Sequence, residues 1–454
     1  MLTNEKGSAL ITVLVVLFIL ITAFFTIYTF AINRIGVIRE DIHTLKAGYL
    51  ASAGINRFQY MVNSDSLNWQ KVLDLEISEQ ISEKESFKVS VDLYGCYLLV
   101  KSTGQSAKVE IKKKAILGIM PDNVYNSAII NHSQDYPLTL SGRTKIIGNA
   151  FLGPHKIIGG SFEGRGFQGT ELVDGRIVNS AQNPKPKIDT TLFEEYLNRI
   201  SDRISTDNKY YFGSVVLGQF DSLPKNYSSF KIENSLEINS LDLQPQNSEI
   251  VVTTGGNIII SGDSRINGLV QLISDKSIIV ENDSNLKNVI LFANDSIIIK
   301  DNSIVSGQLL SKGKISITDS AKILNPSLIY SYNDNESDSA LICYWGKSYS
   351  EAVSVSYDSK SNFIADKNNI FIDTNVTVAG LVYSHYISDI RGSINGITES
   401  DSYRFIKPPT VYINWLIDIN VDRSKLSFIP ILPISFPYEN GYAILDIVEQ
   451  DPRK

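Results

Sequence analysis

The fold is decided by four isoleucine-rich runs: Ile258-Ile259-Ile260, Ile278-Ile279-Val280, Ile297-Ile298-Ile299 and Ile315-Ser316-Ile317. Their starts are separated by 20, 19 and 18 residues. A nearly constant period of this length is typical of proteins built from stacked structural repeats. The region from about Gly256 to Tyr330 therefore predicts four similar units that lie one on top of another.

Each run is followed by a polar turn and then by further strand-like residues. The turns are Gly262-Asp263-Ser264, Asn282-Asp283-Ser284, Asp301-Asn302-Ser303 and Asp319-Ser320-Ala321. Asn, Asp, Ser and Gly accept tight backbone turns, whereas β-branched residues favour strands. Three short strands per repeat predict one coil of a parallel β-helix, or β-solenoid, whose coils must stack to bury their apolar faces. An antiparallel meander is the alternative with similar spacing.

Similar segments flank this core. The run from Ile370 to Ser384 aligns with the run from Ile297 to Ser311, and both place a glycine ten residues after the first isoleucine. Upstream, Leu138 to Gly142 and Lys145 to Ala150 look like earlier, glycine-rich coils. The β-solenoid is therefore predicted to cover residues 119–400, with insertions at about 172–234 and 331–369.

Two further elements are expected at the edges of the solenoid. Thr191 and Glu194 have the spacing of a capping box, and they open a helix whose apolar face is Leu192, Leu197, Ile200 and Ile204. This helix would cover an edge that otherwise invites strand addition. Residues 401–454, with prolines at 430, 433 and 437, are expected to form a C-terminal cap.

The N-terminal segment carries no charge from Ser8 to Ile32. A helix of this length rises 1.5 Å per residue and exceeds the roughly 30 Å hydrocarbon core of a bilayer. The apolar period continues to about Val62, which predicts one long transmembrane and amphipathic helix over residues 1–62. Alternation between Ser86 and Leu117 predicts a small antiparallel sheet within residues 63–118, which would bury the apolar stripe of the helix.

Two stretches of this segment resemble a known family. Glu5-Lys6-Gly7-Ser8-Ala9-Leu10-Ile11, and later Ala47-Gly48-Tyr49-Leu50-Ala51-Ser52-Ala53-Gly54-Ile55, are similar to the start of type IV pilin-like proteins, closest to the PilX-type minor pilins. The resemblance implies a short leader cut by a prepilin peptidase, with Gly7 and Ser8 flanking the processing site. Major pilins carry a glutamate where this chain has Thr12, which argues against a bulk fibre subunit. An ordinary signal anchor, in which Gly7 is incidental, is the alternative.

Composition excludes several classes of protein. The formal net charge is -7 and no long basic run is present, which argues against a nucleic-acid partner. Two cysteines, Cys96 and Cys343, exclude a disulfide framework. They are expected to be independent, half-buried thiols, and a single bridge between them outside the cytoplasm is the alternative. The four histidines lack the close pairing of zinc sites, so no metal or cofactor is expected; they are His43, His132, His155 and His385.

Enzymes that cleave polysaccharides are often β-helices, so catalysis is a candidate function. The candidate carboxylates are Asp263, Asp283, Asp295, Asp301 and Asp319. Their turn positions explain them without chemistry, and no hydrolase, phosphate-binding or metalloprotease motif is present. Several tyrosines could form a binding face or could pack in the core and at edges; they are Tyr210, Tyr211, Tyr330, Tyr332, Tyr344 and Tyr349.

The sequence thus favours a non-enzymatic, minor pilin-like surface protein that takes part in pilus or secretion-fibre assembly, or in adhesion. It would be a single-pass protein of the bacterial envelope with its N-terminus inside, although Lys6, Arg34 and Arg39 do not settle the orientation by charge. Expected partners are membrane lipid, pilin-like subunits, a prepilin peptidase, and a glycan or protein ligand. The alternatives are an anchored carbohydrate-active β-helix enzyme and an anchored scaffold, somewhat like bactofilins in coil length.

Overall fold

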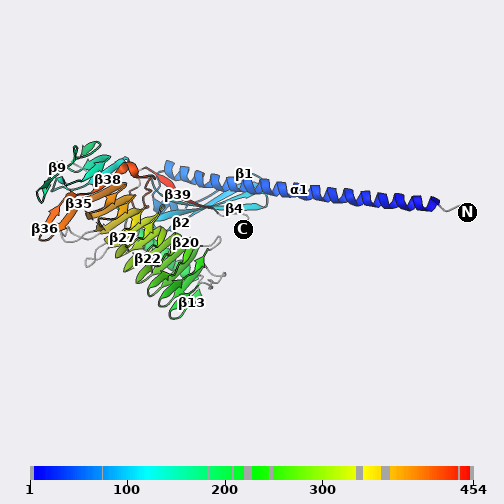
Figure 1. The fold of residues 1–454 in the computed structure, drawn as a ribbon. Helices are drawn as coiled ribbons and strands as arrows, with labels where there is room; N and C mark the ends of the chain where they lie inside the picture. The colour runs from blue at the N-terminus through cyan, green and yellow to red at the C-terminus, as the bar shows by residue number, and fades with distance from the viewer. Residues whose placement is uncertain are drawn as a thin grey trace.

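The computed structural model describes residues 5–73, 75–180, 184–206, 209–218, 228–244, 249–333, 341–358, 369–437 and 440–449. A single long helix projects from a β-rich globular part, and the N-terminus lies at the far end of this helix (Figure 1). The globular part contains a small antiparallel sheet beside the helix, which we call the head, and a large parallel sheet over residues 127–180 and 209–422, which we call the parallel body.

The long helix is α1 (Glu5–Ser64), and a short helix α2 (Trp69–Leu73) follows it. It is continuous because an uncharged apolar stretch runs directly into an amphipathic one, with neither proline nor a run of turn residues between them. Among the described residues, α1 is the one helix long and apolar enough to cross a membrane. This agrees with the predicted single span.

The head is a five-stranded antiparallel sheet in the order β1-β2-β3-β4-β39. Its strands are β1 (Glu76–Ser82), β2 (Glu85–Tyr94), β3 (Tyr97–Ser106), β4 (Val109–Ile119) and β39 (Tyr442–Glu449). The predicted small sheet is therefore present. The prediction that 401–454 forms a cap is wrong for β39, because this strand returns to the head and pairs with β4.

The repeated isoleucine runs form four short strands of the parallel body. These strands are β19 (Ile258–Ser261), β21 (Ser277–Val280), β23 (Ser296–Ile299) and β25 (Lys314–Ile317). Each pairs in parallel with the next, so that Ile258, Ile278, Ile297 and Ile315 form one fully buried ladder. Parallel pairing one repeat apart excludes the antiparallel meander for these strands and is consistent with a β-helix.

The other strands of the parallel body continue the same stacking on both sides of this ladder. Those up to residue 311 are β13 (Lys209–Tyr211), β14 (Val215–Leu217), β15 (Ser229–Ile232), β16 (Leu236–Asn239), β17 (Asp242–Leu243), β18 (Ile250–Thr254), β20 (Arg265–Ser274), β22 (Asn285–Ala293) and β24 (Ile304–Ser311). Those beyond it are β26 (Lys322–Ile323), β27 (Leu328–Asn333), β28 (Leu341–Tyr344), β29 (Tyr349–Ser350), β30 (Val353–Asp358), β31 (Ile370–Ile372), β32 (Thr377–Val378), β33 (Leu381–Ile390), β34 (Ser393–Ile394), β35 (Ile397–Lys407), β37 (Trp415–Ile417) and β38 (Asn420–Asp422). Strand β36 (Thr410–Ile413) folds back antiparallel on β35.

Both predicted insertions contain strands of the parallel body. Within 331–369, β28 pairs in parallel with β25 and β31, and β30 pairs with β27 and β33. Residues 334–340 and 359–368 lie outside the described part of the chain. Within 172–234, strands β13 to β15 also pair in parallel with later coils. The insertion prediction is wrong for these strands because the spacing becomes irregular; Ile342 pairs with Ile315, for example, although it lies 27 residues further along the chain.

The segment with residues 127–179 stacks at an unexpected end of the body. Its strands are β5 (Ser127–Asn131), β6 (Leu138–Ser141), β7 (Lys145–Ile147), β8 (Asn149–Leu152), β9 (Ile157–Gly159), the hairpin β10 (Ser161–Phe162) and β11 (Arg165–Gly166), and β12 (Ile177–Asn179). Strand β35 pairs in parallel with β5, β37 with β6, and β38 with β7. The glycine-rich strands thus follow the last strands of the body in space although they come earlier in the chain, and residues 415–422 belong to the body rather than to a cap. In Figure 1 the cyan and teal strands accordingly lie beside the orange ones.

Helix α3 (Thr191–Thr206) carries the chain from one end of the body to the other. The helix is present as predicted, but Asp189 rather than a capping box satisfies its start, since Asp189 Oδ1 accepts hydrogen bonds from the backbone and hydroxyl of Thr191. Its buried face includes Phe193 and Tyr196 in addition to predicted residues. It packs along the side of the stack, where Tyr196 donates to Gln271, and not over an end.

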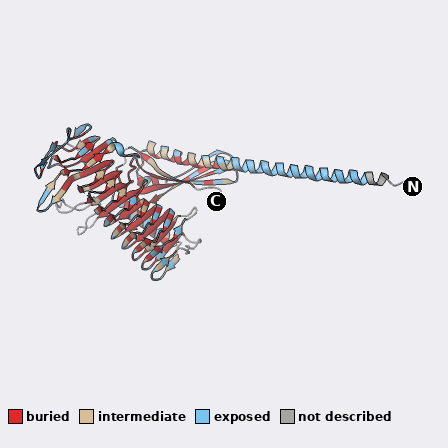
Figure 2. Ribbon diagram, in the orientation of Figure 1, coloured by how far each residue is buried: buried red, intermediate tan, exposed pale blue. Residues whose placement is uncertain are grey.

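Two apolar cores result from this arrangement, and both appear as buried residues in Figure 2. One core fills the inside of the parallel body with stacked isoleucine, leucine and valine. The other lies between the head, α3 and the outer side of the body, and includes Phe58 of α1, Leu99 of the head and Phe292 of the body. The head and the body therefore share a core.

Candidate functional site

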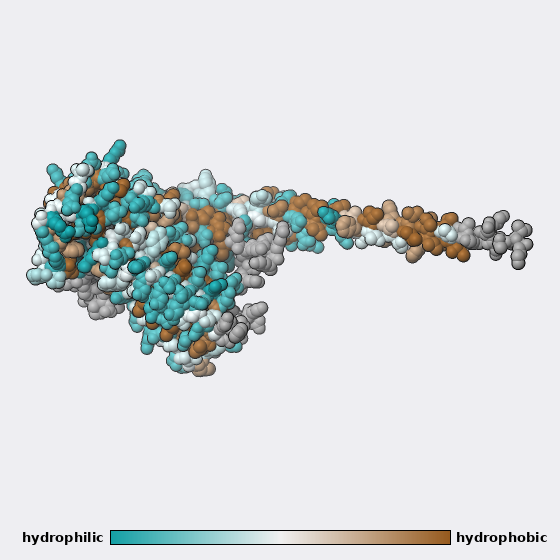
Figure 3. Space-filling view, viewed as in Figure 1, coloured by the Kyte–Doolittle hydropathy of each residue, from teal (hydrophilic) through white to brown (hydrophobic). Residues whose placement is uncertain are grey.

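The N-terminal half of α1 stands clear of the globular part (Figure 1). Every described side chain from Leu10 to Ile42 is exposed, and the residues up to Ile32 carry no charge. Figure 3 shows the hydrophobic colour along this part of the helix, clear of the globular part. Exposed apolar surface of this extent marks a membrane or protein contact. The segment is long enough to cross a bilayer or to pack among similar helices.

The C-terminal half of α1 packs tightly on the head. Its buried residues recur every three or four positions, as an amphipathic helix requires; they are Ala47, Ala51, Ile55, Phe58 and Val62. Small residues permit the close approach, since a side chain at Gly104 of β3 would overlap the backbone of Ala47 and Ala51. Ala47, Ala51 and Gly54, three of the small residues that carry the resemblance to pilins, therefore have a direct packing role in this chain.

The predicted processing residues lie at the start of α1. Gly7 and Ser8 fall within its first turns, and their side chains lie outside what the structure describes. Thr12 is exposed on the same apolar stretch. Cleavage between Gly7 and Ser8 stays a prediction, as does the role inferred for Thr12.

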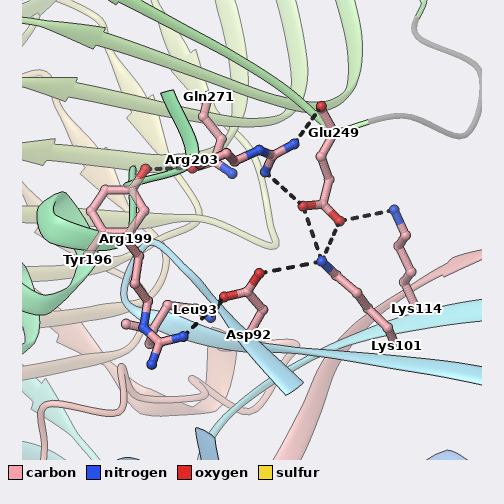
Figure 4. Close-up of polar contacts among 9 residues, drawn as sticks. All are labelled: Asp92, Leu93, Lys101, Lys114, Tyr196, Arg199, Arg203, Glu249 and Gln271. Carbon is pink, nitrogen blue, oxygen red and sulfur yellow. Dashed lines mark hydrogen bonds and ion pairs between the residues drawn. The ribbon is translucent and has the colours of Figure 1, made fainter. Parts of the chain in front are cut away.

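A cluster of charges joins the head to the parallel body (Figure 4). Glu249, at the entry to β18, lies 3.0 Å from Lys101 Nζ, 3.1 Å from Lys114 Nζ and 3.1 Å from Arg203 Nη1. Burial would raise the pKa of Glu249, but the positive charges of Lys101, Lys114 and Arg203 lower it to about 2. Glu249 is therefore ionised at neutral pH and links β3, β4 and α3 to the body.

The cluster extends onto the surface through a second carboxylate. Asp92 of β2 lies 3.5 Å from Lys101 Nζ and 3.7 Å from Arg199 Nη1. Beside it, the side chain of Gln308 accepts from the backbone N–H of Cys96 and donates to the carbonyl of Tyr94, both at 2.8 Å. These polar contacts fix the head to the body.

A cavity of about 470 Å³ opens where the head, the body and the chain returning to β39 meet. Inside it, His132 Nε2 lies 2.8 Å from Glu399 Oε1, and both side chains are almost fully buried. Nothing in the sequence links His132 to Glu399, because Glu399 lies 267 residues away. A charged residue at Glu399, within a strand of the body, is the signal in the sequence that could mark this site. The sequence does not show that His132 is its partner. We call this space the Glu399 cavity.

The other residues considered from the sequence occupy structural positions. Asp263, Asp283, Asp301 and Asp319 all adopt the left-handed turn conformation, with φ between 57° and 59°. Asparagine and aspartate tolerate this conformation best, which accounts for these residues at the turns. Asp295 lies outside this set and precedes β23. The aspartates lie one repeat apart along the stack, in line with a turn role.

The tyrosines and cysteines divide between core and surface. Tyr330 and Tyr344 are fully buried, whereas Tyr210 is 40% exposed. Cys96 and Cys343 are unpaired and buried, more completely than expected, and burial raises the pKa of both thiols. A raised pKa leaves a thiol protonated and unreactive at neutral pH.

The remaining histidines serve separate local contacts. His43 Nδ1 lies 2.9 Å from the hydroxyl of Ser106, and His155 lies against the carbonyl of Gln134. Burial, with the charge of Lys185, lowers the pKa of His385 to about 3. Among the described residues there is no group of three or more histidine, cysteine, aspartate or glutamate side chains that could hold a metal ion.

Comparison with known proteins gives limited results. No protein-family model matches the chain, and no curated protein matches it. The crystal structure of the competence-associated pilin ComZ from Thermus thermophilus aligns with 89% of this chain and 97% of its own, at 10% identity and a TM-score of 0.24. At this TM-score the likeness carries no argument about fold or function, so the geometry of α1 and its resemblance in sequence carry the functional case.

Proposed function

We propose that this chain is a non-enzymatic, minor pilin-like subunit whose α1 helix is inserted in a membrane or in the core of a fibre. One observation carries the proposal. A single helix is exposed and apolar over Leu10–Ile32 and then packs, without a break, into the antiparallel sheet of the head. A helix of a soluble protein would not leave so much apolar surface uncovered.

The parallel body favours a subunit that is present rarely or at the tip of a fibre over one that repeats along the fibre. It is a parallel β-helix of many coils that extends to one side of the helix axis (Figure 1). A bulk subunit must accept copies of itself all around the helix, and a large body beside the head restricts this. Together with Thr12 in place of glutamate, this favours a rare or tip position, with the body extracytoplasmic and the N-terminus inside.

An anchored carbohydrate-active enzyme is the second candidate, and the Glu399 cavity is the observation that favours it. Asp122 and Glu399 line this cavity together with Lys185 and Lys187. Glycosidases need two carboxylates on opposite sides of the scissile bond. However, Glu399 already bonds His132, and no described contact links it to Asp122. We therefore assign the cavity to binding rather than to cleavage.

Fractionation of the native host tests the proposal. Cells are sheared to release surface fibres, and the chain is sought in the fibres and in the membranes. A pilin-like subunit is expected in both fractions, and a Gly7→Val variant, whose leader should resist cleavage, is expected in membranes alone. Detection of the unaltered chain in membranes alone, in cells that do make fibres, would favour the anchored scaffold and contradict the proposal.

A further inference from the structure

The parallel body ends in a coil whose outer edge is uncovered. Strands β9 and β12 pair with β6 and β8 of the preceding coil, and no described strand pairs with them on the other side. This end lies opposite the N-terminus of α1 (Figure 1). The next described residue after this coil, Pro184, lines the Glu399 cavity with Phe151, at the side of the stack and not over its end. We call residues 172–179 the distal edge.

The backbone of the distal edge offers unused hydrogen-bonding groups. The carbonyls of Asp174 and Arg176 accept hydrogen bonds from the preceding coil. Backbone groups of an extended strand point alternately to its two sides, so those of Gly175, Ile177 and Asn179 point away from the body. Within the described part of the chain these groups have no strand to pair with. An unpaired edge of this kind is a ready template for another strand.

The side chains of the distal edge are partly apolar and partly charged. Ile177 and Val178 are 45% and 43% exposed. Asp174 and Arg176 are exposed as well, and no ion pair with a described residue holds either of them. Apolar and charged groups side by side fit a protein partner better than a lipid surface, because the two opposite charges cancel any attraction to anionic headgroups.

A second copy of this chain satisfies these charges. Two copies related by a twofold axis through Gly175 run antiparallel at their distal edges. The residue before Gly175 in one copy then faces the residue after it in the other. Asp174 therefore faces the partner's Arg176, and Arg176 faces the partner's Asp174. Moving the centre to Ile177 would place Arg176 opposite the partner's Val178 and would lose both ion pairs.

The same arrangement covers the apolar residues of the distal edge. Ile177 faces the partner's Val173, and Val178 faces the partner's Leu172. Cross-strand pairs of opposite charges and of apolar side chains both stabilise an antiparallel contact. Gly175 meets the partner's Gly175 at the centre, where no side chain keeps the two backbones apart.

From this complementarity we propose that the distal edge binds the distal edge of a second copy of this chain. A twofold axis across the end of the stack reverses the direction of the stack, so the two α1 helices point away from each other. The contact joins molecules that are anchored in facing membranes or carried on separate fibres. It does not depend on whether α1 enters a fibre, so the proposal goes beyond the proposed function.

The test uses the full chain reconstituted in phosphatidylcholine vesicles that carry one of two fluorescent dyes. Added protease confirms that the globular part faces outward on the vesicles. Two-colour clusters are counted by flow cytometry. Because many weak contacts act together between two vesicles, we expect the unaltered chain to raise clustering at least about tenfold over protein-free vesicles.

Charge reversal tests the facing pair directly. Arg176→Asp brings carboxylates together and Asp174→Arg brings guanidinium groups together, so vesicles carrying either variant alone should lose clustering. Vesicles that carry Arg176→Asp should cluster with vesicles that carry Asp174→Arg, because each carboxylate again meets a guanidinium group. Lys287→Asp, on the exposed side of β22, is the matched control and should cluster as the unaltered chain does. Circular dichroism shows that each variant is folded.

The proposal is wrong if vesicles carrying the unaltered chain do not cluster, or if either single variant clusters as well as the unaltered chain. It is also wrong if the two variants fail to cluster with each other, because Asp174 and Arg176 then do not face one another. Clustering of the unaltered chain with protein-free vesicles would show that the distal edge binds lipid and not a second copy.

Discussion

The two halves of α1 share one continuous helix but differ completely in their surroundings. From Leu10 to Ile42 every described side chain is exposed, whereas Ala47, Ala51 and Phe58 are fully buried against the head. The exposed half is rich in large aliphatic and aromatic residues, and the packed half approaches the head through alanine and glycine. Large apolar residues therefore mark the half that is uncovered in this structure, and small residues mark the half that packs on the head.

The largest effect is expected from removing the exposed half. Deletion of residues 1–33 should convert a detergent-requiring protein into a water-soluble one. Its unfolding midpoint should stay within about 2 °C of that of the full chain, because no buried contact is lost. Ultracentrifugation after membrane extraction, together with circular dichroism, measures both. A deletion product that unfolds or aggregates would show that the two halves are not separable.

Matched phenylalanines sharpen the difference between the halves. Phe58→Ala should lower the free energy of unfolding by about 3–5 kcal/mol, because it leaves a void between α1 and the sheet. Phe25→Ala, at a position 68% exposed, should leave it nearly unchanged. Urea titration of both variants in the same detergent gives the two values. Equal losses would contradict the division of α1 into an external and an internal half.

The next largest effect on stability is expected from the charge cluster at Glu249. Glu249→Gln leaves Lys101, Lys114 and Arg203 close together without their carboxylate, and should cost about 3 kcal/mol at neutral pH. A matched control is Glu237→Gln on the exposed face of β16, which should cost little.

The same cluster has a pH dependence with a defined sign. The folded pKa of Glu249, about 2, lies below its usual value of 4.5. Its stabilisation is therefore complete above about pH 4.5 and is lost as the pH falls toward 2, and it amounts to about 3 kcal/mol. The free energy of unfolding of the unaltered chain should therefore fall more steeply over this pH range than that of Glu249→Gln. Parallel curves would show that Glu249 is not held by its cations.

The smallest effect concerns two glycines within α1. A side chain at Gly54 would overlap Ser102 and press on Phe87 and Val89, so Gly54→Val should cost about 2 kcal/mol by overpacking. Gly48 faces open space, and Gly48→Val should change stability by less than about 0.5 kcal/mol. Thermal unfolding of the pair separates tight packing from helix propensity, since both changes share the same propensity.

Local periodicity explains what the sequence could predict. Ile258, Ile278, Ile297 and Ile315 recur at nearly one coil length, so their ladder follows from spacing alone. The uncharged stretch after Ser8 likewise predicts a helix that faces lipid or other helices. Each of these features depends on residues close together in the chain.

Long-range pairing explains what the sequence could not predict. Spacing does not say that β5 stacks on β35, or that β39 returns to pair with β4, because any free strand edge could accept either strand. The contact of His132 with Glu399, and of Glu249 with Lys101 and Arg203, depends on that stacking. These sites were therefore visible only as isolated residues in the sequence.

The first residue of the mature chain distinguishes a processed assembly helix from a plain anchor at α1. The full chain is produced with and without an active prepilin peptidase, extracted from membranes, and analysed by intact-mass and N-terminal peptide mass spectrometry. We expect a chain that begins at Ser8, with a methylated amine, when the peptidase is present. A chain that still begins at Met1 beside an active peptidase would contradict this expectation.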